Sequence, residues 1–209
     1  MFVSLLEKFV TLWVVIDPIG TIPVFLAVTA GMASSTRRKI AFQAALFACG
    51  VLLFFLVAGQ LLIDALGISL PAFQIAGGIV LFLFALTMIF GASKPASEVE
   101  DAEKTGQDAS PAIFPIAVPS IAGPGAMLAV VLLTDNNRFS IEEQAITAGL
   151  MLAVVSVTFV LMLAAGPILK VIRLSGAAIV SRVMGLILAS VAADNVIAAI
   201  IELLRTTEI

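Results

Sequence analysis

Long apolar stretches separated by short polar segments run along nearly the whole chain. A membrane-spanning helix needs about 20 consecutive apolar residues, and these stretches reach that length. None of them alternates apolar and polar residues with a period of two, as the strands of a membrane β-barrel do. The pattern predicts an all-α integral membrane protein with six transmembrane helices, at residues 5–30, 40–65, 71–90, 111–133, 145–169 and 177–204.

The composition agrees with this pattern and excludes several classes of protein. Apolar residues make up 61% of the chain and charged residues only 12%, which excludes a soluble globular domain. A net charge of −3 with few basic residues excludes a nucleic-acid-binding surface. The chain has no histidine, and Cys49 is its single cysteine, so a metal site would need oxygen ligands alone. We therefore expect the lipid bilayer as a partner, and neither a metal nor a cofactor.

Lysines and arginines are distributed unevenly between the two predicted sides of the membrane. Eight of the eleven follow predicted spans one, three and five or lie just inside span six, and three fall on the other side. The eight are Arg37, Arg38, Lys39, Lys94, Lys104, Lys170, Arg173 and Arg182, and the three are Lys8, Arg138 and Arg205. Because such residues gather on the cytoplasmic side, we predict that both termini face outward.

Two predicted spans are interrupted in their middles by proline and glycine. Residues 13–23 read WVVIDPIGTIP, and residues 115–125, half a chain later, read PIAVPSIAGPG. Within a bilayer, irregular backbone is tolerated only where protein or a water-filled cavity satisfies its N–H and C=O groups. Breaks at corresponding places in two halves therefore predict a binding site near the membrane midplane.

The longest polar segment divides the chain into two groups of three predicted spans. We predict an N-terminal three-helix repeat at residues 1–92, a cytoplasmic linker at 93–110 and a C-terminal three-helix repeat at 111–209. Since three spans reverse the direction of the chain, a repeat between the halves must be inverted in the membrane.

Two weak internal matches support such a repeat. A shift of 107 residues places Gly78–Leu81 on Gly185–Leu188, and a shift of 106 residues places Pro18 on Pro124. The second match sets the broken first span against the broken fourth span. A 3+3 inverted repeat of this kind is the plan of many secondary transporters.

The interrupted motifs, together with a third sequence, resemble those of a known family. Residues 17–25 (DPIGTIPVF), 115–126 (PIAVPSIAGPGA) and 182–188 (RVMGLIL) resemble the MarC family of six-span bacterial inner-membrane proteins. The resemblance covers nearly the whole chain and implies a multi-pass protein of the bacterial inner membrane. Because the family includes transporters of alanine and glycine, it also implies transport of small neutral amino acids. The chain departs from the family pattern at Thr21, where asparagine is commoner, and at residues 193–195, where the last span is usually less charged.

A substrate site is predicted where the two breaks meet. The N–H groups at the start of a half-helix suit an anion, so those of Gly123, Gly125 and Ala126 are expected to hold the carboxylate of an amino acid. Asp17 and free carbonyl groups near Ile16 are expected on the amine side. The predicted substrate-binding residues are Asp17, Pro18, Gly20, Thr21, Pro23, Pro119, Ser120, Gly123, Pro124, Gly125 and Ala126.

Each of these features also has an interpretation without a substrate. Asp17 lies near the midplane, where a carboxylate suits proton or substrate coupling, but it could be only the N-cap of a half-helix beginning at Pro18. The prolines and glycines could merely kink helices for packing. Arg182 could pair with a carboxylate of another span as a gate, or snorkel to the cytoplasmic surface. Asp194 could line a polar cavity or a water-exposed rim.

Three classes of function remain open at this point. The favoured class is a secondary transporter of small neutral solutes such as amino acids, coupled to protons because Asp17 is the obvious buried titratable group, with sodium as the other possible ion. Asp17, Arg182 and Asp194 are its predicted coupling or gating residues. A channel, or a passive facilitator or exporter of another small polar solute, would use the same broken helices. An enzyme is not expected, because no span carries paired catalytic carboxylates or a serine with an evident base. Small residues at Gly77–Gly78 and at Gly149 with Ala153 suit helix contacts within a subunit or in a homo-oligomer.

Overall fold

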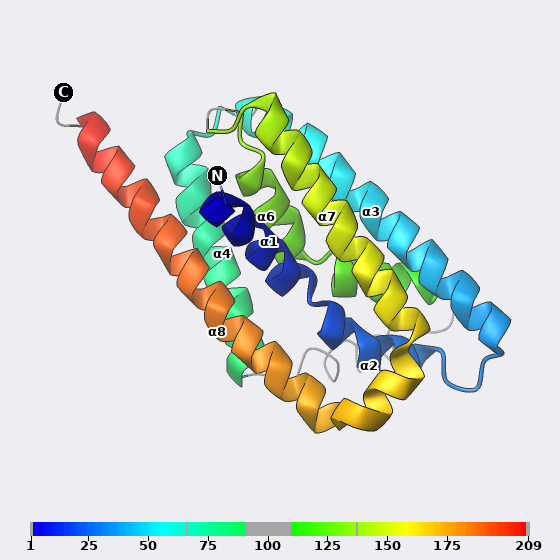
Figure 1. The fold of residues 1–209 in the computed structure, drawn as a ribbon. Helices are drawn as coiled ribbons and strands as arrows, with labels where there is room; N and C mark the ends of the chain where they lie inside the picture. Colours follow the sequence, from blue (N-terminus) through cyan, green and yellow to red (C-terminus); the bar gives the residue numbers. More distant parts are fainter. Residues whose placement is uncertain (1, 66, 91–109, 137, 208–209) are drawn as a thin grey trace.

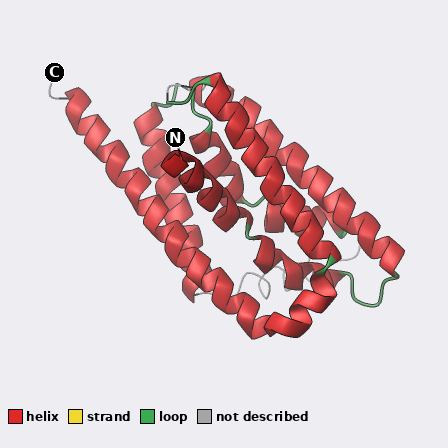
Figure 2. Cartoon of the chain, in the orientation of Figure 1, coloured by secondary structure: helices red, strands yellow, loops and turns green. Residues whose placement is uncertain are grey.

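The computed structural model describes residues 2–65, 67–90, 110–136 and 138–207, and all regular elements in these ranges are helices. Figures 1 and 2 show the chain as a bundle of long helices joined by short loops. The helices are α1 (Phe2–Ile16), α2 (Pro18–Val28), α3 (Ser34–Ala65), α4 (Leu70–Phe90), η1 (Ala112–Ile121), α6 (Pro124–Leu133), α7 (Ile141–Leu163) and α8 (Ala165–Thr207). The all-α prediction is confirmed. Except for Ser110, the predicted linker at 93–110 lies outside the described residues.

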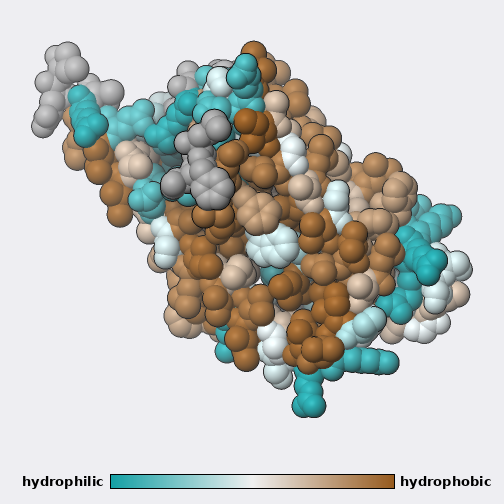
Figure 3. Space-filling model, in the orientation of Figure 1, coloured by the Kyte–Doolittle hydropathy of each residue, from teal (hydrophilic) through white to brown (hydrophobic). Residues whose placement is uncertain are grey.

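Within the described ranges, the helices long and apolar enough to cross a membrane agree with the hydropathy pattern. Five such spans are present, at Leu5–Val28, Ser34–Gly59, Pro71–Phe90, Ile141–Leu163 and Ala165–Arg205. A sixth is obtained when η1 and α6, which are bent by 52° relative to each other, count as one broken span. Figure 3 shows apolar side chains across the middle of the visible face and hydrophilic ones toward its ends, as a lipid-facing surface requires.

The predicted fifth span, residues 145–169, is wrong at both ends. Helix α7 begins at Ile141, because Ser140 and Glu143 form a capping box in which the Ser140 N–H donates to Glu143 Oε2 over 2.9 Å. It ends at Leu163, where Ala164 leaves the helical conformation. The polar residues Glu142 and Glu143 suit the first turn of a helix, and hydropathy alone placed them outside it.

Helix α8 contains a sharp turn near its start. Arg173 has a φ of 57° and a ψ of 171°, a left-handed conformation that is rare for residues other than glycine. The turn separates a short segment at residues 165–172 from the long straight part of α8, which contains the predicted sixth span. The long part lies beside α4 along much of its length.

The first span lies at the centre of the bundle. Its apolar window is 72% buried, whereas the windows of the other four spans are 22–33% buried. Helices α3 and α7 lie side by side on one flank of it, and α4 and α8 lie side by side on the other (Figure 1). The second broken span, η1 with α6, also runs through the interior, in the opposite direction to α1 and α2. Most residues of both breaks are therefore buried among the helices, although Pro124 of the second break is exposed.

The ends of the helices alternate between the two ends of the bundle, as six spans require. The end of α2, the end of α4 and the turn after α7 lie at one end (Figure 1). The start of α1 (Phe2), the end of α8 (Thr207) and the loop between α6 and α7 lie at the other. The predicted assignment of these ends to the cytoplasm and the outside rests on the charge distribution and stays a prediction.

Candidate functional site where the two broken spans cross

The first break is a single residue, Asp17, between α1 and α2. Its backbone has a φ of 49°, and its Oδ1 accepts a hydrogen bond of 2.9 Å from the N–H of Gly20. Pro18 occupies the first turn of α2, where its missing N–H costs nothing. The N-cap interpretation of Asp17 is thereby confirmed. The carboxylate is only 2% exposed, so it lies buried at the core of the protein.

The second oxygen of Asp17 is bound by a residue that the sequence analysis did not single out. Ser181 of α8 donates a hydrogen bond of 3.0 Å to Asp17 Oδ2, and Ser181 is itself 1% exposed. Buried residues follow each other on one face of α8 at Ala177, Ser181, Gly185 and Leu188. A hydroxyl on an otherwise apolar helical face was the signal that could have identified it.

The second break is longer and more irregular. Within η1, Phe114 and Val118 adopt extended conformations because each precedes a proline, which disfavours the helical region. Gly123 is also extended, and α6 begins after it without any side-chain cap. The first backbone bond of α6 runs from the N–H of Met127 to the carbonyl of Gly123 over 3.0 Å. The N–H groups of Gly125 and Ala126 therefore precede the helical bonds of α6.

The two breaks contact each other directly. Ser120 Oγ donates a hydrogen bond of 3.2 Å to Thr21 Oγ1, and Thr21 Oγ1 donates one of 3.1 Å to the carbonyl of Asp17. Ser120 and Thr21 are both fully buried, at 0% exposure. The structure thus brings together predicted site residues from both halves of the chain in one buried polar cluster.

In this conformation, protein atoms occupy the space beside the glycines of the breaks. A Cβ on Gly20 would lie 2.1 Å from Asp17 Oδ2, and a Cβ on Gly123 would lie 2.6 Å from the carbonyl oxygen of Pro119. At Gly125, a Cβ would lie 3.1 Å from the ring of Phe84. The small size of these residues serves close packing here, so a ligand could approach them on these sides only after Asp17, the Pro119 carbonyl or the Phe84 ring has moved.

A large cavity lies beyond the breaks, toward the end of the bundle that holds Phe2. It has a volume of about 600 Å³ and lies between α1, α4, α6, α8 and the loop after α6. We call it the outer cavity. It is lined by Leu6, Glu7, Lys8, Val10, Thr11, Leu81, Ala129, Leu132, Leu133, Arg138, Phe139, Ser190, Val191, Asp194 and Asn195.

Asp194 lies in the lining of the outer cavity and is itself exposed, so both predicted environments, a polar wall and a water-exposed rim, remain compatible with its position. Arg182, in contrast, is exposed on α8, outside this cavity. Among the described residues Arg182 makes no ion pair with a carboxylate, so the gating pair is absent from this conformation. Pro23 lies inside α2 and is buried.

Two cations at the outer cavity are engaged by the protein itself. Lys8 Nζ donates to Thr147 Oγ1 over 3.1 Å and to the carbonyl of Glu143 over 3.4 Å, and it lies 4.0 Å from the centre of the Phe139 ring. Arg138 pairs with Glu202 over 2.8 Å. These contacts tie α1 to α7, and the loop after α6 to α8.

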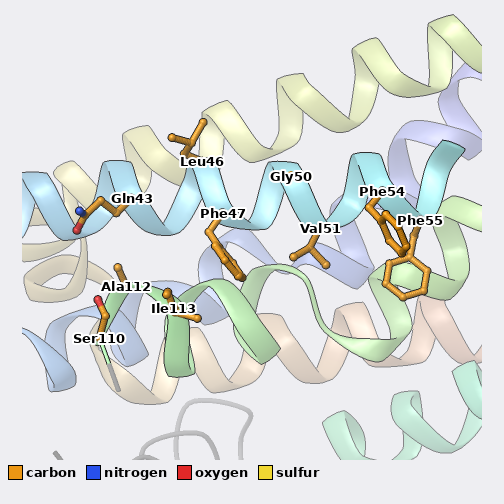
Figure 4. Close-up of a pocket in the computed structure, with 10 residues that line it drawn as sticks. All are labelled: Gln43, Leu46, Phe47, Gly50, Val51, Phe54, Phe55, Ser110, Ala112 and Ile113. Atoms are coloured by element: carbon orange, nitrogen blue, oxygen red, sulfur yellow. The ribbon is translucent and has the colours of Figure 1, made fainter. Parts of the chain in front are cut away.

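Two other cavities are lined by none of the residues of the buried polar cluster. An apolar groove of about 710 Å³ runs between α3 and η1, and Figure 4 shows Phe47 and Val51 of α3 pointing toward η1 across it. The groove is lined by Gln43, Leu46, Phe47, Gly50, Val51, Phe54, Phe55, Ser110, Ala112 and Ile113. A smaller cavity of about 170 Å³ lies beside Arg37 and Arg38, near the end of α2.

These features define a multi-pass integral membrane protein in which two discontinuous spans cross at the centre of a helical bundle. The chain belongs to the MarC family, because the model of that family, described as MarC family integral membrane protein, matches residues 2–204. This confirms the family resemblance found in the sequence.

Curated relatives are similar over nearly their whole length. A UPF0056 membrane protein of Archaeoglobus fulgidus is 30% identical over 97% of this chain and 94% of its own. The UPF0056 membrane protein YvbG of Bacillus subtilis is 30% identical over 92% of each chain. The UPF0056 inner membrane protein MarC of Salmonella arizonae is 27% identical over 91% of this chain and 90% of its own. No solved structure matches the chain.

Proposed function

We propose that this protein is a secondary transporter of small neutral amino acids, alanine and glycine among them, whose substrate binds between the two broken spans. The observation that carries the proposal is the hydrogen bond from Ser120 to Thr21, which joins the two breaks beside Asp17 at the centre of the bundle. Irregular backbone inside a membrane is costly, and in transporters it is found where a substrate binds at the midplane.

The groups at the crossing match the two charged ends of an amino acid. The N–H groups of Gly125 and Ala126 lie at the positive end of α6, which has no side-chain cap, and suit a carboxylate. The carboxylate of Asp17, on the other span, suits an ammonium group. A zwitterion placed between them would replace the contact of Ser120 with Thr21.

Asp17 is also the proposed coupling group. Each of its oxygens accepts one hydrogen bond, from Gly20 of α2 and from Ser181 of α8. A proton added to Oδ2 would change the contact that joins the break to α8, and a proton added to Oδ1 would change the cap of α2. Proton binding would thereby act on the packing of the broken span against its neighbour, which coupled transport requires. Sodium is the alternative coupling ion.

The arrangement of the helices supports an inverted repeat with alternating access. The two broken spans run in opposite directions, α3 lies beside α7, and α4 lies beside α8 (Figure 1). An inverted repeat of residues 1–92 and 111–209 would pair these same helices. The outer cavity leads toward the crossing from one end, while the buried contact of Ser120 with Thr21 closes the centre. A closed centre with access from one side favours a transporter over a channel.

The proposed location is the bacterial inner membrane, with both termini outside. The relative from Salmonella arizonae is named an inner membrane protein, and the charge distribution supports an orientation in which the start of α1 and the end of α8 face outward. The outer cavity would then open to the periplasm. This orientation makes it the entry for import and the exit for export.

Uptake into proteoliposomes tests the proposal. We expect labelled alanine to accumulate when an inward proton gradient is imposed. A parallel experiment with a sodium gradient tests whether sodium is the coupling ion instead. Asp17→Asn should abolish accumulation while keeping the fold, because asparagine is as good an N-cap as aspartate. Glu142→Gln, an exposed change in the first turn of α7, is the matched control. If the folded protein takes up neither alanine nor glycine, the proposal is refuted.

A further inference from the structure

The acidic groups of the outer cavity are free, whereas its basic groups are engaged. Lys8 donates two hydrogen bonds to α7, and Arg138 pairs with Glu202 of α8. Asp194 and Glu7, which line the same cavity, make no hydrogen bond or ion pair with any part of the chain that the structure describes. Asp194 and Glu7 are both exposed, so the cavity offers a solute two carboxylates that no basic group of the described residues pairs with.

Thr11 supplies a second and independent observation, at the inner part of the cavity. It is only 8% exposed and lines the cavity, yet in the described ranges its hydroxyl makes no hydrogen bond. Thr134 and Thr158, in contrast, donate to the carbonyls of Val130 and Val154, each four residues earlier. The Thr11 hydroxyl is therefore available to a polar group inside the cavity, as a donor or as an acceptor.

The remaining walls limit the size and chemistry of that partner. Leu81, Ala129 and Leu132 make one side of the cavity apolar, which suits a small uncharged side chain. Asn195 lies beside Asp194 and carries an amide that can donate to a carboxylate. Thr11 is six residues before Asp17 on the first span, or about 9 Å along the helix axis at 1.5 Å per residue.

We propose that the outer cavity is a binding site for a small primary ammonium ion, held by Asp194 with Thr11 as a second polar contact. For a transported amino acid, this cavity is a second binding site. The substrate occupies it before or after it binds where the two broken spans cross. The residues of the cavity are the evidence for the ammonium site. Only the identification of its ligand as an amino acid rests on the proposed function.

Cysteine reactivity in the full chain tests the site without measuring transport. Ser190 lines the cavity, so Ser190→Cys is introduced together with Cys49→Ala, which removes the single native thiol. The protein is placed in lipid nanodiscs, and its modification by two methanethiosulfonates is timed, one carrying trimethylammonium and one carrying sulfonate. We expect the cationic reagent to react at least about tenfold faster, because a carboxylate in a cavity concentrates cations.

Protection by small solutes identifies the ligand. Ethylammonium should slow the modification and propionate should not, since only the former carries the ammonium group. Asp194→Asn should remove both the preference for the cationic reagent and the protection, whereas Asp194→Glu should keep the preference. Thr11→Val should weaken the protection, and Glu142→Gln, outside the cavity, should change neither.

The outcomes separate this inference from the proposed function. Equal rates for the two reagents, or protection that survives Asp194→Asn, would overturn the ammonium site. Protection by ethylammonium and by alanine would support both the site and the substrate. Protection by ethylammonium without protection by alanine would keep the site and refute the amino-acid assignment.

Discussion

Ser181 of α8 donates a hydrogen bond of 3.0 Å to Asp17 Oδ2, joining the first break to a helix 164 residues away in sequence. Together with the bond from Gly20, it gives each carboxylate oxygen a donor in a fully buried position. The relationship makes Asp17 part of the contact between α2 and α8 as well as the cap of α2.

We expect Ser181→Ala to reduce uptake several-fold and to lower thermal stability. The substitution removes a donor to a buried carboxylate, at a cost of about 1–2 kcal/mol. Uptake into proteoliposomes and the melting temperature in detergent are the measurements. Ser156→Ala is a matched control, because Ser156 is exposed on α7 and bonds only within its own helix. Equal effects of the two substitutions would contradict the role of Ser181.

Gly20→Ala should be among the most damaging single changes in the chain. The added methyl group would lie 2.1 Å from Asp17 Oδ2, so the carboxylate must leave its position on α2. We expect loss of uptake and a clear drop in melting temperature. The control is Gly149→Ala in α7, where no atom lies within 4 Å of the added Cβ. That change should be neutral or slightly stabilising, because alanine favours helix more than glycine does. A tolerated Gly20→Ala would show that the cap geometry can relax.

The two glycines of the second break should differ in their tolerance of alanine. At Gly123 the added Cβ meets the backbone oxygen of Pro119 at 2.6 Å, whereas at Gly125 it meets the ring of Phe84 at 3.1 Å. A ring can shift more easily than a backbone carbonyl, so Gly123→Ala should be the more destabilising of the two. Melting temperatures of both variants, measured side by side, check the order.

The contact between the breaks should have a measurable coupling energy. We expect Ser120→Ala and Thr21→Val to be non-additive in a double-mutant cycle, with a coupling of about 0.6 kcal/mol, the average for such bonds between membrane helices. The free energy of unfolding in detergent is the quantity compared. Additive effects would mean that the two hydroxyls lie side by side without stabilising the crossing.

The sequence was informative about the breaks and less so about what surrounds them. Proline and glycine act on their own backbone, so residues 17–18 and 123–124 could be identified as interruptions without knowledge of their neighbours. The cap at Asp17 followed from the same local chemistry. The start of α7 was misplaced, because the hydropathy of Glu142 and Glu143 concealed a capping box.

Contacts between distant segments were the part that could not be predicted. Nothing near Ser181 in the sequence indicates that it bonds to Asp17, since that depends on how α8 packs against the broken span. Arg182 attracted attention because it is charged, although it is the neighbouring hydroxyl that is buried. Asp194 could be placed in a polar wall or at a rim from its position alone, and only the packed helices show a cavity there.

The buried contacts of Lys8 have a mechanical consequence for the first span. Lys8 bonds the α1 half of this span to α7. The bond between Asp17 and Ser181 joins the start of the α2 half to α8. Within each half, helical bonds keep the segment stiff. We therefore expect a tilt of α8 against α7 to bend the first span at Asp17, where its helical bonds are interrupted by left-handed backbone.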